Sequence, residues 1–213
     1  MNKKFIAIEG NIGSGKTSLA SLMAKRFDSG LILEQFKEND FLQHFYEEPE
    51  RHALPMELWF MAERYKQMED YLSKGHLFHS AVISDYIFPK TLLFAQQNLN
   101  EREFRLFTRL FQMLEIQLPQ PELIIFLYRP VKQLLQQIKE RGRSYEQNIQ
   151  PEYLNGIQEQ YDQYFRNYCE VPVLYLDLGT FDLLGTPEAI DDIVELIEAP
   201  LEDGIRYAQI PMQ

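Results

Sequence analysis

The sequence predicts an α/β protein whose core is a doubly wound, five-stranded parallel sheet. Short apolar segments alternate along the chain with longer segments of helical periodicity, which is the order expected when helices connect parallel strands. The apolar segments are hydrophobic at nearly every position, as in strands that helices cover on both faces. A glycine-rich segment, residues 10–17, separates the first apolar run from the first helical one, which predicts a tight loop between a strand and a helix.

The predicted strands are the apolar segments 4–9, 30–34, 80–85, 122–128 and 172–177. The predicted helices are the periodic segments 16–28, 39–47, 53–74, 89–98, 100–117, 130–141, 151–168 and 186–198. Ligands of such sheets bind beyond the carboxyl ends of the strands. The residues of interest at those ends are Glu34, Asp85, Arg129 and Asp177.

The composition bounds the organisation and the partners of the chain. With 213 residues, 45% of them hydrophobic, we expect a single domain over residues 1–213 with a full core. The formal charge of −11 argues against a nucleic-acid polymer or an anionic membrane as partner. A lone cysteine, Cys169, the lack of a charged-then-apolar leader and the lack of a long apolar run favour an unsecreted, cytoplasmic protein.

Residues 10–17 match the phosphate-binding pattern G-x-x-x-x-G-K-[ST]. They are Gly10, Asn11, Ile12, Gly13, Ser14, Gly15, Lys16 and Thr17. The glycines let backbone N–H groups point inward, where they and the helix N-terminus bind phosphate oxygens. Lys16 is expected to reach the β- and γ-phosphates of a nucleotide, and the Thr17 hydroxyl to bind Mg²⁺. The alternative is a chance match in a turn, which the flanking strand and helix disfavour.

Two carboxylates end strands near this loop. Glu34 can act as a general base beside an acceptor group, although a solvated carboxylate at a strand end is common. Asp85 stands where a phosphate-loop enzyme keeps a carboxylate near its magnesium, and its spacing to Pro89 is poor for a helix cap. We therefore expect Thr17 and Asp85 to contact the metal, directly or through water.

Arg141 and Arg143 lie in a polar segment, residues 140–150, that we interpret as a lid. Arginines on a mobile loop can close over a nucleotide and neutralise charge on the transferring phosphoryl group. The alternative is ordinary positive charge at a helix C-terminus.

Glu57 and Arg64 are seven residues apart in the predicted helix 53–74, so they share a face about two turns apart. A carboxylate and a guanidinium among apolar groups can bind a flat heterocycle, and the alternative is a pair of surface charges. We expect Trp59 to lie in the core.

The segment 34–63 is poor in strong bases and rich in acids. Its strong bases are Lys37 and Arg51, and its acids are Glu34, Glu38, Asp40, Glu47, Glu48, Glu50, Glu57 and Glu63. A nucleoside monophosphate kinase needs arginines for the phosphate of its acceptor, whereas this environment repels a phosphate. The balance favours transfer to an uncharged alcohol, such as the 5′-hydroxyl of a nucleoside.

Several segments between about residue 4 and residue 180 carry a resemblance to one family. They are Ile8–Thr17, Leu33–Glu34, Phe45–Arg51, Ala62–Tyr65, Glu140–Arg143, Glu146–Gln147 and Pro151–Leu154. By these segments the chain resembles the deoxynucleoside kinase family, which includes deoxycytidine, deoxyguanosine and deoxyadenosine kinases. The phosphate loop alone does not single out this family, but the lid followed by the tyrosine-containing segment does.

The resemblance implies transfer of the γ-phosphate of ATP, with Mg²⁺, to the 5′-hydroxyl of a small-molecule deoxynucleoside, a reaction of nucleotide salvage. It implies that Glu34 deprotonates this hydroxyl. Tyr46 and Glu146 are implied to hold the sugar 3′-hydroxyl, and Arg141 and Arg143 to bind the donor phosphates.

The resemblance also implies that the loop 177–182 contacts the donor adenine and that the protein is a homodimer paired through helices. The apolar side chains of 53–74 and 100–117 can form such a pairing face, or they simply cover the sheet.

Two positions depart from the family pattern. Asp85 is followed by Tyr86, where family members usually carry an arginine that positions the 5′-oxygen and the base. Lys90, or Arg64, which falls on a family arginine near the base and the catalytic carboxylate, can substitute for it. Glu57 falls where the family usually has a glutamine that binds the base.

An ionised Glu57 offers two hydrogen-bond acceptors, which match the N1–H and N2–H₂ donors of guanine. A protonated Glu57 mimics glutamine and serves adenine or cytosine. These considerations favour a purine deoxynucleoside as substrate.

Two alternatives remain open at the level of the sequence. A thymidylate-kinase-like enzyme shares the fold and the phosphate loop, and the arginine-poor segment 34–63 argues against it. A nucleotide-binding module without catalysis is kept open by the missing arginine after Asp85.

Overall fold

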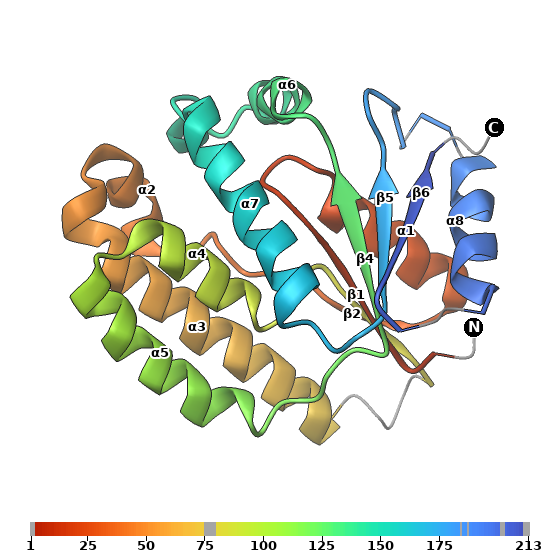
Figure 1. Ribbon diagram of the computed structural model, residues 1–213, viewed down its shortest axis with the longest axis horizontal. Helices are drawn as coiled ribbons and strands as arrows, with labels where there is room; N and C mark the ends of the chain where they lie inside the picture. Colours follow the sequence, from red (N-terminus) through yellow and green to blue (C-terminus); the bar gives the residue numbers. More distant parts are fainter. Residues whose placement is uncertain (1–2, 75–79, 184, 187, 201–202, 211–213) are drawn as a thin grey trace.

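The computed structural model describes residues 3–74, 80–183, 185–186, 188–200 and 203–210. Within them a six-stranded sheet runs in the order β2-β3-β1-β4-β5-β6, with every neighbouring pair parallel (Figure 1). The strands are β1 (Phe5–Gly10), β2 (Gly30–Ile32), β3 (Val82–Ser84), β4 (Leu123–Tyr128), β5 (Val173–Asp177) and β6 (Ile205–Gln209). The prediction of a doubly wound parallel α/β fold is confirmed.

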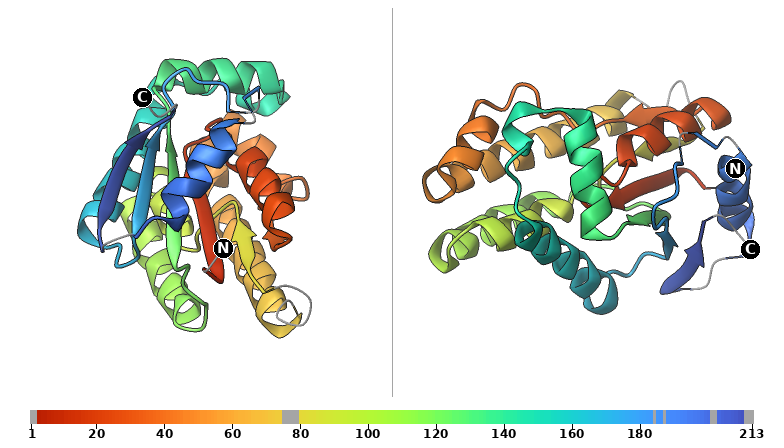
Figure 2. Two further views of the ribbon diagram at one scale, coloured as in Figure 1. Left: turned by 90° about the vertical axis from the view of Figure 1, so that its right-hand side faces the viewer. Right: turned by 90° about the horizontal axis from the view of Figure 1, so that it is seen from above.

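Helices cover both faces of this sheet (Figures 1 and 2). Their bounds are α1 (Lys16–Phe27), α2 (Asp40–Glu47), α3 (Pro49–Lys74), α4 (Lys90–Asn98), α5 (Glu101–Glu115), α6 (Val131–Arg141), α7 (Pro151–Asn167) and α8 (Glu188–Glu198), with a short 3₁₀ turn, η2 (Ser144–Glu146). Helices α1 and α8 pack on one face, and α3, α4, α5 and α7 pack on the other.

The central strand β1 shows why the strands are apolar at nearly every position. Phe5 and Ala7 belong to the core under α3, α4, α5 and α7. Ile6 and Ile8 belong to the core under α1 and α8. Because successive side chains of a strand point to opposite faces, a strand with a core on each face needs apolar residues at nearly every position.

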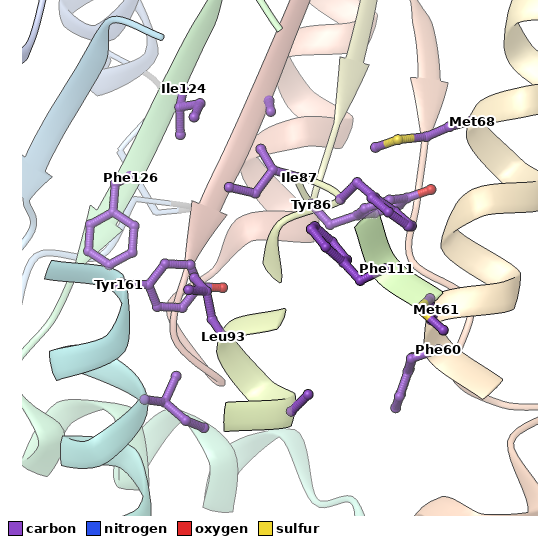
Figure 3. Close-up of a cluster of buried hydrophobic side chains, with 14 of the residues drawn as sticks. Phe60, Met61, Met68, Tyr86, Ile87, Leu93, Phe111, Ile124, Phe126 and Tyr161 are labelled. Atoms are coloured by element: carbon purple, nitrogen blue, oxygen red, sulfur yellow. The ribbon is translucent and has the colours of Figure 1, made fainter. Parts of the chain in front are cut away.

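The larger core is rich in aromatic side chains (Figure 3). The rings of Phe126 and Tyr161 lie 5.0 Å apart, which joins β4 to α7. Trp59, which was expected in the core, is only partly buried and packs against it, and Cys169 also packs against it with its thiol donating to the carbonyl of Val171. Such aromatic contacts add to the free energy gained by burial.

The prediction of five strands is wrong by one, because β6 continues the sheet beyond β5. Sequence periodicity missed β6 since it is an edge strand, whose residues Arg206, Tyr207 and Gln209 are wholly or partly exposed. The helix predicted to begin at residue 53 begins at Pro49, with Pro55 inside it. No helix of the described residues is long and apolar enough to cross a bilayer.

The sheet order determines where a ligand can bind. From β1 the chain goes to β2 and β3 on one side of this strand and then crosses to β4, β5 and β6 on the other side. Such a reversal leaves a crevice at the carboxyl ends of the strands. The loop after β1 and the residues after β2 and β3 all lie at this edge.

Candidate active site

The loop after β1 is shaped by its glycines. At Gly10 a Cβ atom would lie 2.5 Å from Ser14 Oγ and 2.7 Å from the carbonyl oxygen of Leu127, so no side chain fits. Gly15 has a φ of 100° and directly precedes α1, a left-handed conformation that glycine adopts at little cost. The loop therefore delivers the positive end of α1 to the crevice, as a phosphate site requires.

Two side chains of the loop face the crevice. Lys16 Nζ donates to the carbonyl of Asn11 at 2.9 Å. Burial and the nearby Lys90 lower the pKa of Lys16 to about 8, against the opposite effect of neighbouring carboxylates. Thr17 Oγ1 donates to Asp85 Oδ2 at 2.5 Å, so the predicted metal-binding pair is in direct contact.

The crevice forms a cavity of about 640 Å³. It contains most of the predicted site residues: Ile12, Gly13, Gly15, Lys16, Thr17, Glu34, Tyr46, Glu57, Arg64, Asp85, Arg141, Arg143 and Glu146. Gly10, Asn11 and Ser14 do not line it. The Asn11 amide instead donates to the carbonyl of Leu154 at 2.8 Å, which anchors the loop to α7.

Glu34 is held by two cations on the wall of this cavity. Its Oε1 accepts from Nε and Nη2 of Arg64 at 2.8 and 2.6 Å, and its Oε2 accepts from Nζ of Lys90 at 2.7 Å. Burial by itself would raise the pKa of Glu34, but Lys90 and Arg64 outweigh it and hold the pKa at about 2. Glu34 is therefore a fixed, ionised carboxylate across the physiological pH range.

Asp85 connects this carboxylate to the phosphate loop. Its Oδ1 accepts from the backbone N–H of Glu34 at 2.7 Å, while its Oδ2 accepts from Thr17. The carboxyl ends of β2 and β3 and the start of α1 are thereby held in one network.

Glu57 lies elsewhere on the wall of the same cavity and is 1% exposed. Its Oε1 accepts from Nδ2 of Asn98 at 2.6 Å, whereas its Oε2 has no hydrogen-bond partner among the described residues. Burial raises the pKa of Glu57 to about 7, although Arg64 and the Asn98 hydrogen bond act in the opposite direction.

The predicted lid residues converge on Glu146. Arg141 pairs with its Oε2, and Arg143 Nη1 lies 3.1 Å from its Oε1. The Arg143 guanidinium also lies 3.7 Å from the centre of the Phe36 ring, a cation–π contact. The lid is thus in contact with the segment that follows β2.

Tyr46 lies beside this lid and lines the cavity. Its ring stacks on Tyr145 with centroids 5.9 Å apart. Burial raises the pKa of Tyr46 well above its ordinary value, so its hydroxyl stays neutral and can both donate and accept hydrogen bonds.

The other two strand-end residues have structural contacts outside the cavity lining. The buried guanidinium of Arg129 donates to the carbonyls of Ser14, Gly179 and Phe181. It ties the phosphate loop to the segment after β5. Asp177 Oδ1 accepts from the backbone of Gly179 and shapes the same segment.

Among the residues that sequence analysis did not assign to the site, Phe36, Thr91, Asn98 and Tyr153 contact predicted site residues or line the cavity. Thr91 accepts from Arg64 Nη1 at 2.8 Å. Tyr153 belongs to the segment Pro151–Leu154 that carries the family resemblance, whereas Phe36, Thr91 and Asn98 belong to no motif. Lys90, which the missing arginine after Asp85 indicated, also lines the cavity.

Comparison with known proteins agrees with this geometry. Residues 6–202 match the model of the family described as "Deoxynucleoside kinase". The chain belongs to the deoxynucleoside kinase family. Among curated relatives, a "Deoxyguanosine kinase" of Bacillus subtilis is 35% identical over 74% of this chain and 76% of the relative. A "Deoxyadenosine/deoxycytidine kinase" of the same organism is 27% identical over 93% and 94%.

Solved structures confirm the fold of this deoxynucleoside kinase. A deoxyadenosine kinase from M. mycoides with bound dCTP superposes with a TM-score of 0.74, at 21% identity, over 90% of this chain and 99% of that one. The same kinase with the products dCMP and a flexible dCDP gives a TM-score of 0.77 at 20% identity, over 92% and 100%.

Family membership decides the reaction class. The protein is a phosphotransferase with an alcohol acceptor, and the family implies a nucleotide phosphate donor. The match to deoxynucleoside kinases sets aside the thymidylate-kinase-like alternative and the non-catalytic module.

Proposed function

We propose that this kinase transfers the γ-phosphate of ATP, with Mg²⁺, to the 5′-hydroxyl of a purine deoxynucleoside, and that deoxyguanosine is preferred. The observation that carries the proposal is the Glu34 carboxylate, held by two cations in the same cavity as the phosphate loop. A relative of 35% identity that is named deoxyguanosine kinase supports the choice of acceptor.

Glu34 is proposed to accept the hydrogen bond, and then the proton, of the 5′-hydroxyl. Its low pKa makes it a weak base. This suffices because phosphoryl transfer passes through a loose transition state in which positioning and electrostatics supply most of the acceleration. A fixed carboxylate orients the hydroxyl in line with the donor phosphate.

The donor end is proposed to use the phosphate loop and the lid. Lys16 and the N-terminus of α1 would bind the phosphates, with Arg141 and Arg143 reaching over from the lid. The oxygens of Thr17 and Asp85 suit Mg²⁺, which neutralises phosphate charge when bound. The described residues hold no group of three His, Cys, Asp or Glu side chains able to bind a metal, and Mg²⁺ usually completes its shell with phosphate oxygens and water.

The protein is proposed to bind both the sugar and the base of the acceptor nucleoside. Tyr46 and Glu146 would hold the 3′-hydroxyl, since a neutral phenol and a carboxylate can both accept a hydrogen bond from it. Glu57 would bind the base, because its unpartnered Oε2 requires a donor and guanine carries two adjacent donors, N1–H and N2–H₂.

Helix α5 is proposed to contribute to a homodimer. Its outer face exposes Leu106, Leu110 and Met113, and Ile116 follows at its end. Apolar side chains that gather on one helix face often mark a protein–protein contact. Sedimentation at micromolar concentration should give twice the mass of 25.3 kDa, and a monomer would contradict this part of the proposal.

An assay with radiolabelled ATP against the four deoxynucleosides and their monophosphates tests the proposed function. The expected result is transfer to deoxyguanosine, less to deoxyadenosine, and none to a monophosphate. Transfer to a monophosphate alone, or binding of nucleotide without any transfer, would contradict it.

A further inference from the structure

The first turn of α4 supports the Glu34 carboxylate through two neighbouring residues. Lys90, whose side chain is 4% exposed, donates to Glu34 Oε2 at 2.7 Å. Thr91, which is fully buried, accepts from Nη1 of Arg64. Arg64 in turn holds Oε1 of Glu34. Each carboxylate oxygen therefore has its own cation, and both cations are anchored at one helical turn.

The segment directly after Asp85 supplies no cation to this site. Tyr86 points into the large aromatic core, where it lies near Phe111 (Figure 3). Its hydroxyl donates to Gln67 Oε1 at 2.9 Å, and it does not line the cavity. Lys90 reaches the carboxylate from one turn further along the chain, and it lines the cavity.

The burial of Lys90 lowers the stability of the fold unless another interaction compensates for it. An ammonium group loses its hydration on burial, and a nearby carboxylate recovers the loss only where the geometry is good. Lys90 also stands close enough to Lys16 to lower its pKa. Two lysines on the wall of one cavity repel each other, and the nearby carboxylates of Glu9, Glu34 and Asp85 act against this repulsion.

On the basis of the proposed transfer, we propose that Lys90 is a positioning residue for the reaction. It holds Oε2 of Glu34 so that the carboxylate faces the acceptor hydroxyl. It also keeps a positive charge on the wall of the cavity that the phosphate loop lines. The role requires the charge of Lys90 and not only the volume of its side chain.

Charge and volume are separated by two substitutions. Lys90→Met keeps an unbranched stem and removes the charge, whereas Lys90→Arg keeps the charge. We expect K90M to lower kcat about 100-fold or more, as the loss of one electrostatic contact in an active site does. The KM values for ATP and the deoxynucleoside should move by less than about fivefold. K90R should stay within about tenfold of the wild-type kcat, and Lys25→Met, at an exposed site on α1, should match the wild type.

Two results would overturn the role of Lys90 while the wild type remains active. One is a K90M enzyme with a kcat within about threefold of the wild type. The other is a folded K90R enzyme as slow as K90M, because charge would then not be what matters. Thermal unfolding checks that each variant is folded. If K90M does not fold, Lys90→Gln replaces it and is judged by the same threshold. A wild-type enzyme that phosphorylates no deoxynucleoside would instead contradict the proposed function itself.

Discussion

Two glutamates on the wall of one cavity differ in how completely the protein satisfies them. Both oxygens of Glu34 are bound by cations, and its pKa is held at about 2. Glu57 has one oxygen bound by Asn98 and the other without a partner among the described residues, and burial raises its pKa to about 7.

This difference indicates which of the two carboxylates has all its hydrogen-bond partners before a substrate binds. A carboxylate that the protein satisfies fully is fixed for chemistry and needs nothing from the ligand. A buried oxygen left unpaired lowers stability by about 1–3 kcal/mol, and a ligand with the right donor recovers this. We therefore assign reactivity to Glu34 and discrimination between bases to Glu57, and four predictions test that division.

The largest effect is expected for Glu34→Gln. A neutral amide cannot take the proton of the hydroxyl, and its NH₂ group meets the donors of Arg64 and Lys90. We expect kcat to fall about 1,000-fold or more with little change in the KM for ATP. Glu38→Gln, an exposed site in the same segment, is the control. A kcat of E34Q within about tenfold of the wild type would show that Glu34 is not the reactive carboxylate.

Glu57→Gln should change the preference between bases and leave the reaction itself intact. The glutamine amide presents a hydrogen-bond donor where guanine also presents a donor, so the two repel each other. The same amide can form hydrogen bonds with adenine, which presents both a donor and an acceptor. The ratio of kcat/KM for deoxyguanosine to that for deoxyadenosine should fall about 10- to 100-fold. The same substitution should lower kcat/KM for deoxyinosine, which lacks the 2-amino group, by less than it lowers kcat/KM for deoxyguanosine. Glu63→Gln on the same helix is the control, and an unchanged preference in E57Q would remove Glu57 from base recognition.

The same preference should depend on pH in the wild type. Glu57 loses its proton as the pH rises through about 7, so above this pH its unpartnered Oε2 can only accept hydrogen bonds, whereas below this pH the protonated group resembles an amide. Arg64 and Lys90 favour the ionised form, and Glu34 opposes it. The deoxyguanosine-to-deoxyadenosine ratio of kcat/KM should rise between about pH 6 and pH 8. It should be flat in E57Q, and a flat wild-type ratio would argue against titration of Glu57.

The smallest effect is expected on stability. Burial raises the pKa of Glu57 from its ordinary value of 4.5, which we take for the unfolded chain, to about 7 in the folded protein. The free energy of unfolding therefore falls as the pH rises between these two values. Glu57→Gln removes this loss. The Tm of E57Q should exceed that of the wild type by a few degrees at pH 8, and by less at pH 5. An equal difference at both pH values would point to packing instead of charge.

Local patterns predicted most of the architecture. Uniform apolar strands and periodic helices follow from burial on two faces, so five strands and the helices between them could be placed within a few residues. The strand β6 could not, because an edge strand is half exposed and lacks the apolar pattern. The phosphate loop was predictable because its glycines, Lys16 and Thr17 must stand at fixed spacing.

The site was predictable where a motif or a strand end marks it. Glu34, Asp85 and Arg64 do meet in one cavity. Thr91 and Asn98 carry no such mark, since they are 27 and 41 positions from the residues they bind. Of the loop, Asn11 was expected to face a ligand and instead anchors to α7, because its amide finds a backbone carbonyl there.

The sequence by itself determined the fold class, the phosphate loop and the family of this protein, because these depend on residue types at short, regular spacings. Only the tertiary structure decided that Lys90 pairs with the second oxygen of Glu34 and that one oxygen of Glu57 has no hydrogen-bond partner among the described residues. The ionisation and the hydrogen bonds of a buried carboxylate depend on groups that packing brings together from distant segments. Two glutamates of identical chemistry can therefore serve reaction and recognition in the same cavity.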